Sequence, residues 1–332
     1  MPAPPTDEER RDAAPGHFVV IGGGTGISPC LRGLREAGQR VTAIVTVADD
    51  GGSSGRLRKE YDILPPGDIR NSLVALSTAG PLREALFSYR FEDSLLRGHS
   101  LGNLLLAVLT RLTGDFRKSI DEARSILGIK DTVLPSTDTR VVLVAHHPDG
   151  TKSTGEQVIS RCGKPISAME LRPRPPRVSE EIEAAVQAAD LIVLGPGSLY
   201  TSIIPNLLVP GMTAVLEASP APVVLVGNLM TQPGETDGFD LGDHVRILRE
   251  VGGLRRLDLV IECSERYSED VIARYQEAGA APVQAAAGAS SVEGVAIKRE
   301  AVSCLTPEGL VRHDGGRLAD VLLRLIHGEG CR

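Results

Sequence analysis

Tryptophan is absent from this 332-residue chain, and aromatic residues of all kinds make up only 3% of it. Stacking of bases on aromatic rings is therefore not a widespread device here. No basic patch resembles a nucleic-acid footprint, and the formal net charge is −7. These absences lead us to expect no DNA or RNA partner. An acidic chain that binds an anionic ligand has to do so locally, with backbone N–H groups and a few cations.

Long apolar runs are also missing. No stretch approaches 18 apolar residues, so the sequence predicts no membrane span, and the N-terminus lacks the apolar segment of a secretory signal. The cysteines are few, far apart and odd in number, which argues against a disulfide framework and against a zinc site. We therefore expect a cytoplasmic protein with free thiols at Cys30, Cys162, Cys263, Cys304 and Cys331.

The order of apolar runs and helical patterns predicts the fold class. Short, continuous apolar runs alternate with helices, which is typical of an α/β protein with a doubly wound, mostly parallel, Rossmann-like sheet. We expect a single domain over residues 17–326, between a disordered tail at 1–16 and a short tail at 327–332. The strand candidates are residues 17–21, 41–48, 191–194, 223–226 and 257–261.

Residues 133–178 do not follow this alternation of strands and helices, and we expect a small β-rich insertion there. Val141–Ala145 and Gln157–Ile159 are predicted strands on either side of Asp149-Gly150, which is a hairpin turn signal. The proline-rich run at 172–176 predicts a loop or an edge, because proline is excluded from central strands.

Four strand candidates end in loops rich in small and polar residues, and parallel strands would bring those loops to one edge of the sheet. After the first strand, Gly23, Gly24, Thr25 and Gly26 precede a helix that we expect Ser28 to cap. Glycines and a free helix N-terminus together predict an anion site. The third glycine of the dinucleotide fingerprint is missing, since Ile27 stands in its place. A tight turn without a ligand is the alternative.

Asp49 and Asp50 follow the second strand, where acidic residues bind ribose hydroxyls or Mg²⁺, or merely cap a turn. In the next polar loop, Asn71 is a candidate ligand-binding residue. Its neighbour Arg70 would either meet a phosphate or form an internal salt bridge with Asp68.

His99 and Asn103 stand at the start of an apolar helix expected over Leu104–Leu112. Small residues and asparagine at a helix start suggest ligand contact, and His99 would be either an acid/base group or an ordinary hydrogen-bonded histidine. After a later strand, Gly195, Gly197 and Ser198 predict a second anion nest, with a plain turn as the alternative. These residues complete the site candidates that local patterns suggest.

Six motifs, in this order and spacing, resemble the YvcK-type gluconeogenesis factor family, also called UPF0052. That family is similar in fold to CofD-type 2-phospho-L-lactate transferases. The match runs from about residue 17 to about residue 326. The motifs are IGGGTGIS, TVADDGGSSGRLR, LPPGDIRNSL, GHSLGNLLLA, GPGSLYTSIIPNLL and NLMTQPGETDG.

The resemblance implies a bacterial cytoplasmic protein that is needed for normal cell shape and for growth on gluconeogenic carbon sources. Members bind UDP-sugars, notably UDP-N-acetylglucosamine, and no firm enzymatic activity is attached to them. The matching motifs give Asn228 as the start of a third ligand loop, and Tyr275 and Arg312 as contacts of the nucleotide sugar. We expect no required cofactor, no catalytic residue, an unidentified regulatory or cell-wall protein partner, and a homo-oligomer.

Two other functions compete with this one. CofD-type relatives use Mg²⁺ to transfer a phospholactyl or related group from a guanosine diphosphate carrier. In such an enzyme, Asp49 or Asp50 would hold the metal, and His99 or Asp68 would act as base. An NAD-dependent oxidoreductase is the third hypothesis. The missing third glycine and the lack of an evident acid/base pair weigh against it.

Overall fold

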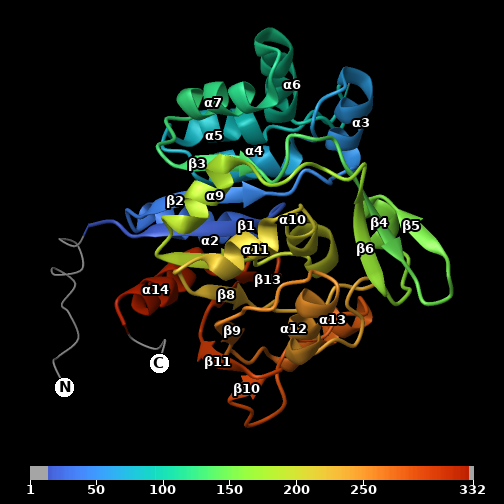
Figure 1. Ribbon diagram of the computed structural model, residues 1–332, viewed down its shortest axis with the longest axis vertical. Coiled ribbons are helices and arrows are strands. Elements are labelled where there is room, and N and C mark those ends of the chain that lie inside the picture. Colours follow the sequence, from blue (N-terminus) through green and yellow to red (C-terminus); the bar gives the residue numbers. More distant parts are fainter. Residues whose placement is uncertain (1–13, 94, 329–332) are drawn as a thin grey trace.

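A computed structural model describes residues 14–93 and 95–328. Its main sheet has eight strands in the order β10-β11-β9-β8-β7-β1-β2-β3, and all neighbours pair in parallel except β10 with β11 (Figure 1). This confirms the predicted α/β class with a mostly parallel sheet. The strands are β1 (His17–Gly22), β2 (Arg40–Val45), β3 (Thr132–Pro135), β7 (Leu191–Leu194), β8 (Val223–Val226), β9 (Leu259–Cys263), β10 (Ser291–Val292) and β11 (Val295–Glu300).

Strand order reverses on the two sides of β1. Its residue Phe18 pairs with Val41 of β2 on one side and with Leu191 of β7 on the other. From β1 the chain builds outward to β2 and β3, and later in the opposite direction through β7, β8 and β9. Open α/β sheets bind ligands beyond the carboxyl ends of their strands at such a reversal. The loops after β1 and β7 are therefore the first place to look for a site.

The central strands are apolar because both of their faces are covered. Every residue of β1, β7 and β8 is buried, as expected for parallel strands between two helical layers. β2 ends at Val45 and not at Ala48, because its neighbours β1 and β3 end at Gly22 and Pro135 and offer no further pairing. The strand expected at 257–261 lies two residues later, in β9.

Helices cover the two faces of the sheet. Helix α2 (Ser28–Glu36) connects β1 to β2 and packs on α14 (Gly315–Ile326) so closely that a Cβ on Gly33 would lie 1.9 Å from the carbonyl oxygen of Gly315. Ser28 is the first residue of α2, and Ile27 occupies the cap position without a side-chain hydrogen bond, so the prediction that Ser28 caps this helix is wrong. Connections that move outward in opposite directions place their helices on opposite faces. The other face carries α9 (Glu180–Gln187), α10 (Ile204–Leu207) and α11 (Met212–Ala218).

A block of five helices separates β2 from β3 and forms the upper part of Figure 1. The apolar helix predicted over Leu104–Leu112 lies within α6, which begins three residues earlier because the Ser100 side chain accepts a hydrogen bond from Asn103 N–H. The block consists of α3 (Gly52–Tyr61), α4 (Gly67–Ala75), α5 (Pro81–Ser88), α6 (Leu101–Thr113) and α7 (Phe116–Ile126).

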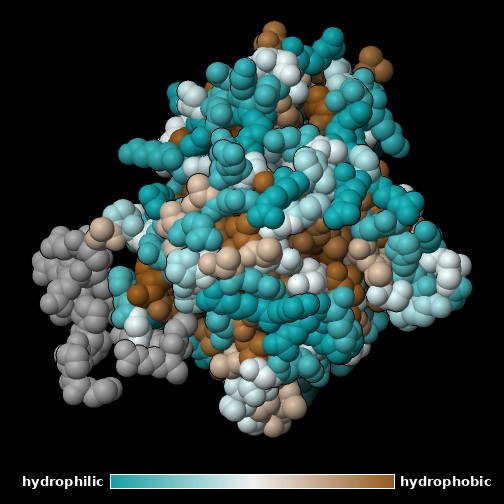
Figure 2. Space-filling view, in the orientation of Figure 1, coloured by the Kyte–Doolittle hydropathy of each residue, from teal (hydrophilic) through white to brown (hydrophobic). Residues whose placement is uncertain are grey.

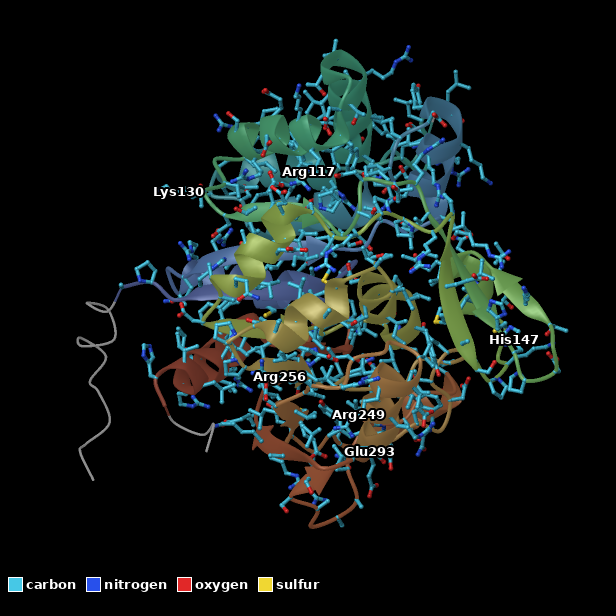
Figure 3. The ribbon with its side chains drawn as sticks, viewed as in Figure 1. Arg117, Lys130, His147, Arg249, Arg256 and Glu293 are labelled. Carbon is cyan, nitrogen blue, oxygen red and sulfur yellow. The ribbon has the colours of Figure 1, made fainter. Side chains whose placement is uncertain are left out.

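A separate three-stranded sheet lies at the right of Figure 1, made of β4 (Val142–His146), β5 (Lys152–Thr154) and β6 (Ala168–Arg172). The hairpin at Gly150 is present, but Gln157–Ile159 is helical and not its second strand, since α8 spans Glu156–Ile159. The turn is tight, so the returning strand follows it directly. His147, labelled in Figure 3, fixes that turn, because its Nε2 is 2.8 Å from Ser153 Oγ.

The last third of the chain completes the molecule with α12 (Leu241–Glu250), α13 (Glu269–Glu277) and a two-stranded sheet of β12 (Ser303–Leu305) and β13 (Val311–His313). Helix α14 ends at Ile326. The tails expected at 1–16 and 327–332 fall largely on residues 1–13 and 329–332, which lie outside the described residues.

The surface in Figure 2 is mostly hydrophilic, with apolar residues showing mainly near the middle, where α10 and α11 lie. In the described part of the chain, no single helix has both the length and the apolar character to cross a membrane. The helices Leu199–Leu207 and Met212–Ala218 are long and apolar enough only when taken together, and the angle between them is 77°. The four described cysteines carry free thiols, and Cys331 lies outside the described residues.

Candidate functional site

The loop after β1 and the loop after β7 touch each other. A Cβ on Gly26 would lie 2.5 Å from the carbonyl oxygen of Pro196 and 2.7 Å from the Cα of Gly197, so only glycine fits at this position. Gly24 has a φ of +62°, which glycine adopts without strain. The two loops thus form adjoining walls at the place where strand order reverses.

Buried polar side chains hold these loops in place. Asn206 Nδ2 donates to the carbonyl oxygens of Gly22 at 3.0 Å and Ser202 at 2.8 Å. The Glu235 carboxylate accepts hydrogen bonds from Tyr200 N–H at 2.9 Å and Thr201 N–H at 3.3 Å. Burial raises the pKa of Glu235 to about 7, even though these N–H groups stabilise its charged form.

The loop after β8 provides a third wall. Gln232 Nε2 donates to Ser198 Oγ at 2.7 Å and so connects this loop to the loop after β7. His313 of β13 approaches the carbonyl oxygen of Gly227 at 3.2 Å, and burial lowers its pKa to about 4. At neutral pH His313 is therefore an uncharged hydrogen-bonding group.

The three loops enclose a cavity of about 670 Å³. Nine of the residues predicted from sequence line it, namely Gly23, Gly24, Thr25, Gly26, Gly197, Ser198, Asn228, Tyr275 and Arg312. Gly195 does not line it, and a Cβ on this residue would point toward the Ile203 side chain and the carbonyl oxygen of Val226. Residues far apart in the chain therefore converge here.

Tyr275 and Arg312 meet through Val311. The Tyr275 hydroxyl accepts a hydrogen bond from Val311 N–H at 2.8 Å, and Arg312 Nη1 donates to the Val311 carbonyl oxygen at 2.9 Å. The Tyr275 ring packs on the apolar cluster that contains Leu229. Its hydroxyl accepts this bond and keeps its own O–H as a donor, so both that O–H and the face of the ring are left for a ligand.

An acidic group lies next to the glycine loops. Gly24 N–H donates to Asp68, and burial, followed by the charge of Asp49, raises the pKa of Asp68 to about 7. Asp49 accepts from Gly51 N–H at 2.7 Å, and its pKa is also raised, mainly by burial. Asp50 accepts from the N–H of Gln157. These predicted residues adjoin the cavity without lining it.

Glu156 completes this acidic group, and sequence reasoning missed it. It lines the cavity, and burial followed by the charges of Asp49 and Asp68 raises its pKa to about 9. Its position in the short α8, just after a hairpin, gave no signal. By contrast, Gln232 and Glu235 stand inside the recognised motif NLMTQPGETDG, which pointed to this loop.

His99 and Asn103 lie together, but away from the cavity lining. Ser53 Oγ is 2.9 Å from His99 Nδ1 and accepts a hydrogen bond from Asn103 Nδ2 at 3.2 Å. Asn71 lies on α4, partly buried, and also does not line the cavity. The site residues predicted from sequence thus do not form one group: nine line the glycine-loop cavity, Gly195, Asp49 and Asp50 lie beside it, and Asn71, His99 and Asn103 belong to the helical block.

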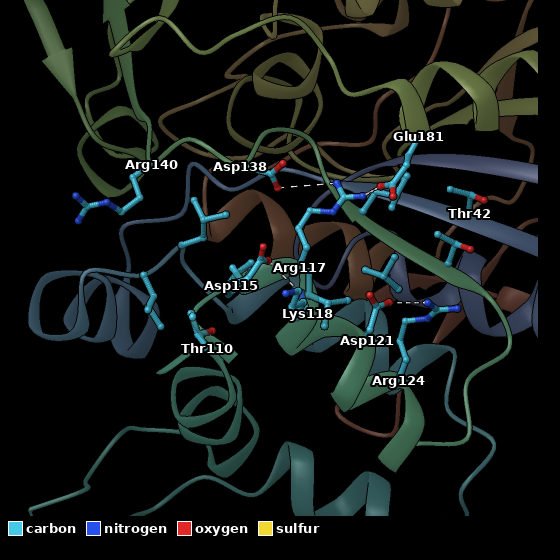
Figure 4. A pocket seen from close by; sticks show the side chains of 18 of the residues that line it. Thr42, Thr110, Asp115, Arg117, Lys118, Asp121, Arg124, Asp138, Arg140 and Glu181 are labelled. Carbon is cyan, nitrogen blue, oxygen red and sulfur yellow. Dashed lines mark hydrogen bonds and ion pairs between the residues drawn. The ribbon is translucent and has the colours of Figure 1, made fainter. Parts of the chain in front are cut away.

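A larger cavity of about 970 Å³ lies beside β3, the last strand of the sheet, between α7 and α9 (Figure 4). Most of its charged side chains are paired, since Arg117 pairs with Glu181 and Asp138, Arg124 with Asp121, and Arg140 with Asp62. None of the predicted site residues lines it. Size alone therefore does not make it the better candidate.

The chain is similar to several known proteins. The profile of the family described as 2-phospho-L-lactate transferase CofD matches residues 18–303. The gluconeogenesis factor of Halalkalibacterium halodurans is 45% identical over 308 residues, which cover 92% of this chain and 95% of that protein. The gluconeogenesis factor of Bacillus subtilis is 42% identical and covers 93% and 98%. A crystal structure of a UPF0052 family member from Bacillus halodurans superposes with a TM-score of 0.86, at 43% identity, over 93% of this chain and 99% of that one.

Proposed function

The chain belongs to the gluconeogenesis factors of the CofD family, and on this premise we propose that it binds a UDP-sugar, UDP-N-acetylglucosamine, in the glycine-loop cavity. In this proposal it is a cytoplasmic, ligand-responsive regulator that is needed for cell shape and for growth on gluconeogenic carbon sources. It would report the supply of a wall precursor to a regulatory or cell-wall protein, and it would act as a homo-oligomer.

One observation carries the proposal, namely the contact between two glycine loops at the reversal of strand order. There, the backbone N–H groups of Thr25 and Gly26 and the positive end of α2 favour a diphosphate, while Gly24 N–H is held by Asp68. Arg312 lines the same cavity and is exposed, so the guanidinium N–H groups that its bond to Val311 does not use can pair with phosphate oxygens. The Tyr275 ring, fixed through its hydroxyl, would stack on the uracil.

Replacing Arg312 tests the diphosphate contact. We expect Arg312→Ala to weaken binding of UDP-N-acetylglucosamine by roughly 1–3 kcal/mol, because a charge-assisted hydrogen bond is lost. Arg32→Ala is the matched control, since Arg32 is an exposed arginine of α2 that does not line the cavity. Calorimetric titration compares the two variants. An unchanged affinity in Arg312→Ala would remove this residue from the site.

A second function, a Mg²⁺-dependent transfer of a phosphorylated group, is favoured by the acidic group. Asp49, Asp68 and Glu156 crowd together beside the glycine loops, and burial raises the pKa of each. No three His, Cys, Asp or Glu side chains in the described residues form a ready metal site. Mg²⁺ needs fewer, because one or two carboxylates with substrate phosphates suffice. Asp49 and Asp50 would hold the ion, which would neutralise diphosphate charge.

Turnover separates the two functions. Under the transferase hypothesis, the protein with Mg²⁺, UDP-sugar and cell extract should consume the nucleotide sugar, and Asp50→Asn should abolish that consumption. Chromatography of the nucleotides measures the result. Recovery of intact UDP-sugar under every condition would contradict the transferase hypothesis and leave only the regulatory function.

A further inference from the structure

We propose that the helical block contains a second anion-binding subsite, built around Arg70 together with His99 and Asn103, which takes a phosphate or carboxylate group of a small ligand. The subsite lies between α4 and α6, away from the lining of the glycine-loop cavity. It does not depend on the identity of the nucleotide proposed above.

Arg70 is a buried cation that lacks a partner. It is only 9% exposed. Across residues 14–93 and 95–328 its guanidinium makes no ion pair and no hydrogen bond, and its Nε atom is wholly buried without a partner. The salt bridge with Asp68, one of the two alternatives expected from sequence, is not formed among the described residues, although the charge of Asp68 acts on Arg70 and raises its pKa against the larger effect of burial. Burying an unpaired charge is costly, so its retention points to a partner that binds from outside.

The fold makes room for this arginine. Gly102 in the first turn of α6 lies against its stem, and a Cβ there would be 2.9 Å from Arg70 Cγ and 2.5 Å from the carbonyl oxygen of Phe87. Any larger residue at 102 would displace the arginine or the backbone of α5. Helix α6 is thus shaped to keep Arg70 in position.

Positive charge surrounds the same region. Arg90 acts on both Arg70 and His99, and it lowers the pKa of each after the larger effect of burial. Arg56 also lies near His99 and lowers its pKa, while Glu60 acts in the opposite direction. Within residues 14–93 and 95–328, the hydrogen bonds of the Arg56 and Arg90 guanidinium groups go to backbone carbonyl oxygens, those of Arg97 and Gly98. Asp68 acts on Arg70 in the opposite direction to Arg90, but the three arginines still outnumber the two carboxylates Asp68 and Glu60, and this excess favours an anion.

Asn103 provides a second, independent sign of a ligand. It is 2% exposed, yet its Oδ1 atom has no hydrogen-bond partner, while Nδ2 donates to Ser53 Oγ at 3.2 Å. If the amide is turned, Oδ1 accepts from the Ser53 hydroxyl and Nδ2 becomes a free donor. A guanidinium fork and an amide donor are the groups that proteins use for phosphate and carboxylate.

Thermal unfolding of the full-length protein tests the subsite. The wild type and Arg70→Met are unfolded with rising inorganic phosphate in one arm and rising succinate in the other, with chloride keeping the ionic strength constant. We expect Arg70→Met to be more stable than the wild type without added anion, because a buried unpaired charge is removed. We expect the apparent affinity for phosphate, succinate or both to fall by about tenfold or more in the variant.

The two arms show which anion binds. If Arg70→Met loses affinity for phosphate alone, the subsite takes a phosphate group, and if it loses affinity for succinate alone, the subsite takes a carboxylate group. Arg32→Met removes a charge from an exposed position and should keep the wild-type response. Arg70→Lys keeps the charge without the fork and should fold normally with a weakened response. The proposal is overturned if Arg70→Met or, should that variant not fold, Arg70→Lys responds to both anions like the wild type. It is also overturned if neither anion stabilises the wild type.

Discussion

Replacing Gly26 with alanine should separate the two glycine loops. The added methyl group would lie 2.5 Å from the carbonyl oxygen of Pro196, 2.7 Å from the Cα of Gly197 and 3.1 Å from the carbonyl carbon of Pro196. All three atoms belong to the backbone, so no side chain can rotate away to relieve the clash. The variant therefore has to move a loop.

The size of the effect follows from this geometry. Forcing one methyl group into a closed contact typically costs about 1–3 kcal/mol, which we expect as the loss in the free energy of unfolding. Moving the loop also displaces the backbone N–H groups that would hold a diphosphate. We therefore expect the affinity for UDP-N-acetylglucosamine to fall by at least about tenfold, which is about 1.4 kcal/mol.

Chemical denaturation and calorimetric titration measure the two effects. Gly316→Ala is the matched control, because its new methyl group would meet only Asp314 Oδ1, at an ordinary 3.5 Å, in the first turn of α14. That variant should keep the wild-type affinity and stability, or gain up to about 1 kcal/mol. Wild-type stability and binding in Gly26→Ala would refute the claim that the two loops form adjoining walls.

Three further replacements test the supports of the cavity. Tyr275→Phe should lower the free energy of unfolding by about 1 kcal/mol, since Val311 N–H loses its acceptor; denaturation measures this. Asn206→Ala removes two buried donor bonds and should cost about 2 kcal/mol in the same assay. Burial raises the pKa of Glu235 to about 7 in the fold, above about 4.3 in the unfolded chain, so stability should fall as pH rises through that window. Glu235→Gln should remove this part of the pH dependence, and parallel curves for variant and wild type would contradict it.

Much of the fold was predictable, because its main signals are local. The continuous apolar runs of β1, β7 and β8 and the glycines that follow them indicated a parallel sheet. The error at Gln157–Ile159 came from reading a short apolar segment by composition, which does not distinguish a strand from one turn of helix. The tight turn and the returning strand at Lys152–Thr154 decided the pairing.

The site was predictable only in part, because its remaining residues act through tertiary contacts. Glycine-rich loops are visible in the sequence itself, so Gly23 to Gly26 could be named as candidates for an anion site. Glu156 carries no such signal, and its raised pKa arises first from burial and then from carboxylates that are distant in the chain. For Arg70 the sequence left two alternatives open, and the absence of a salt bridge with Asp68 could be seen only once the backbone was placed.

Calorimetric titration of the wild-type protein with UDP-N-acetylglucosamine, GDP and NAD tests the central claim most directly. The loops, the cavity of about 670 Å³ and the positions of Tyr275 and Arg312 predict saturable binding that is tightest for the UDP-sugar. Tighter binding of GDP would favour the transferase hypothesis, and tighter binding of NAD would favour an oxidoreductase. The absence of binding heat with UDP-N-acetylglucosamine at several temperatures would contradict the account.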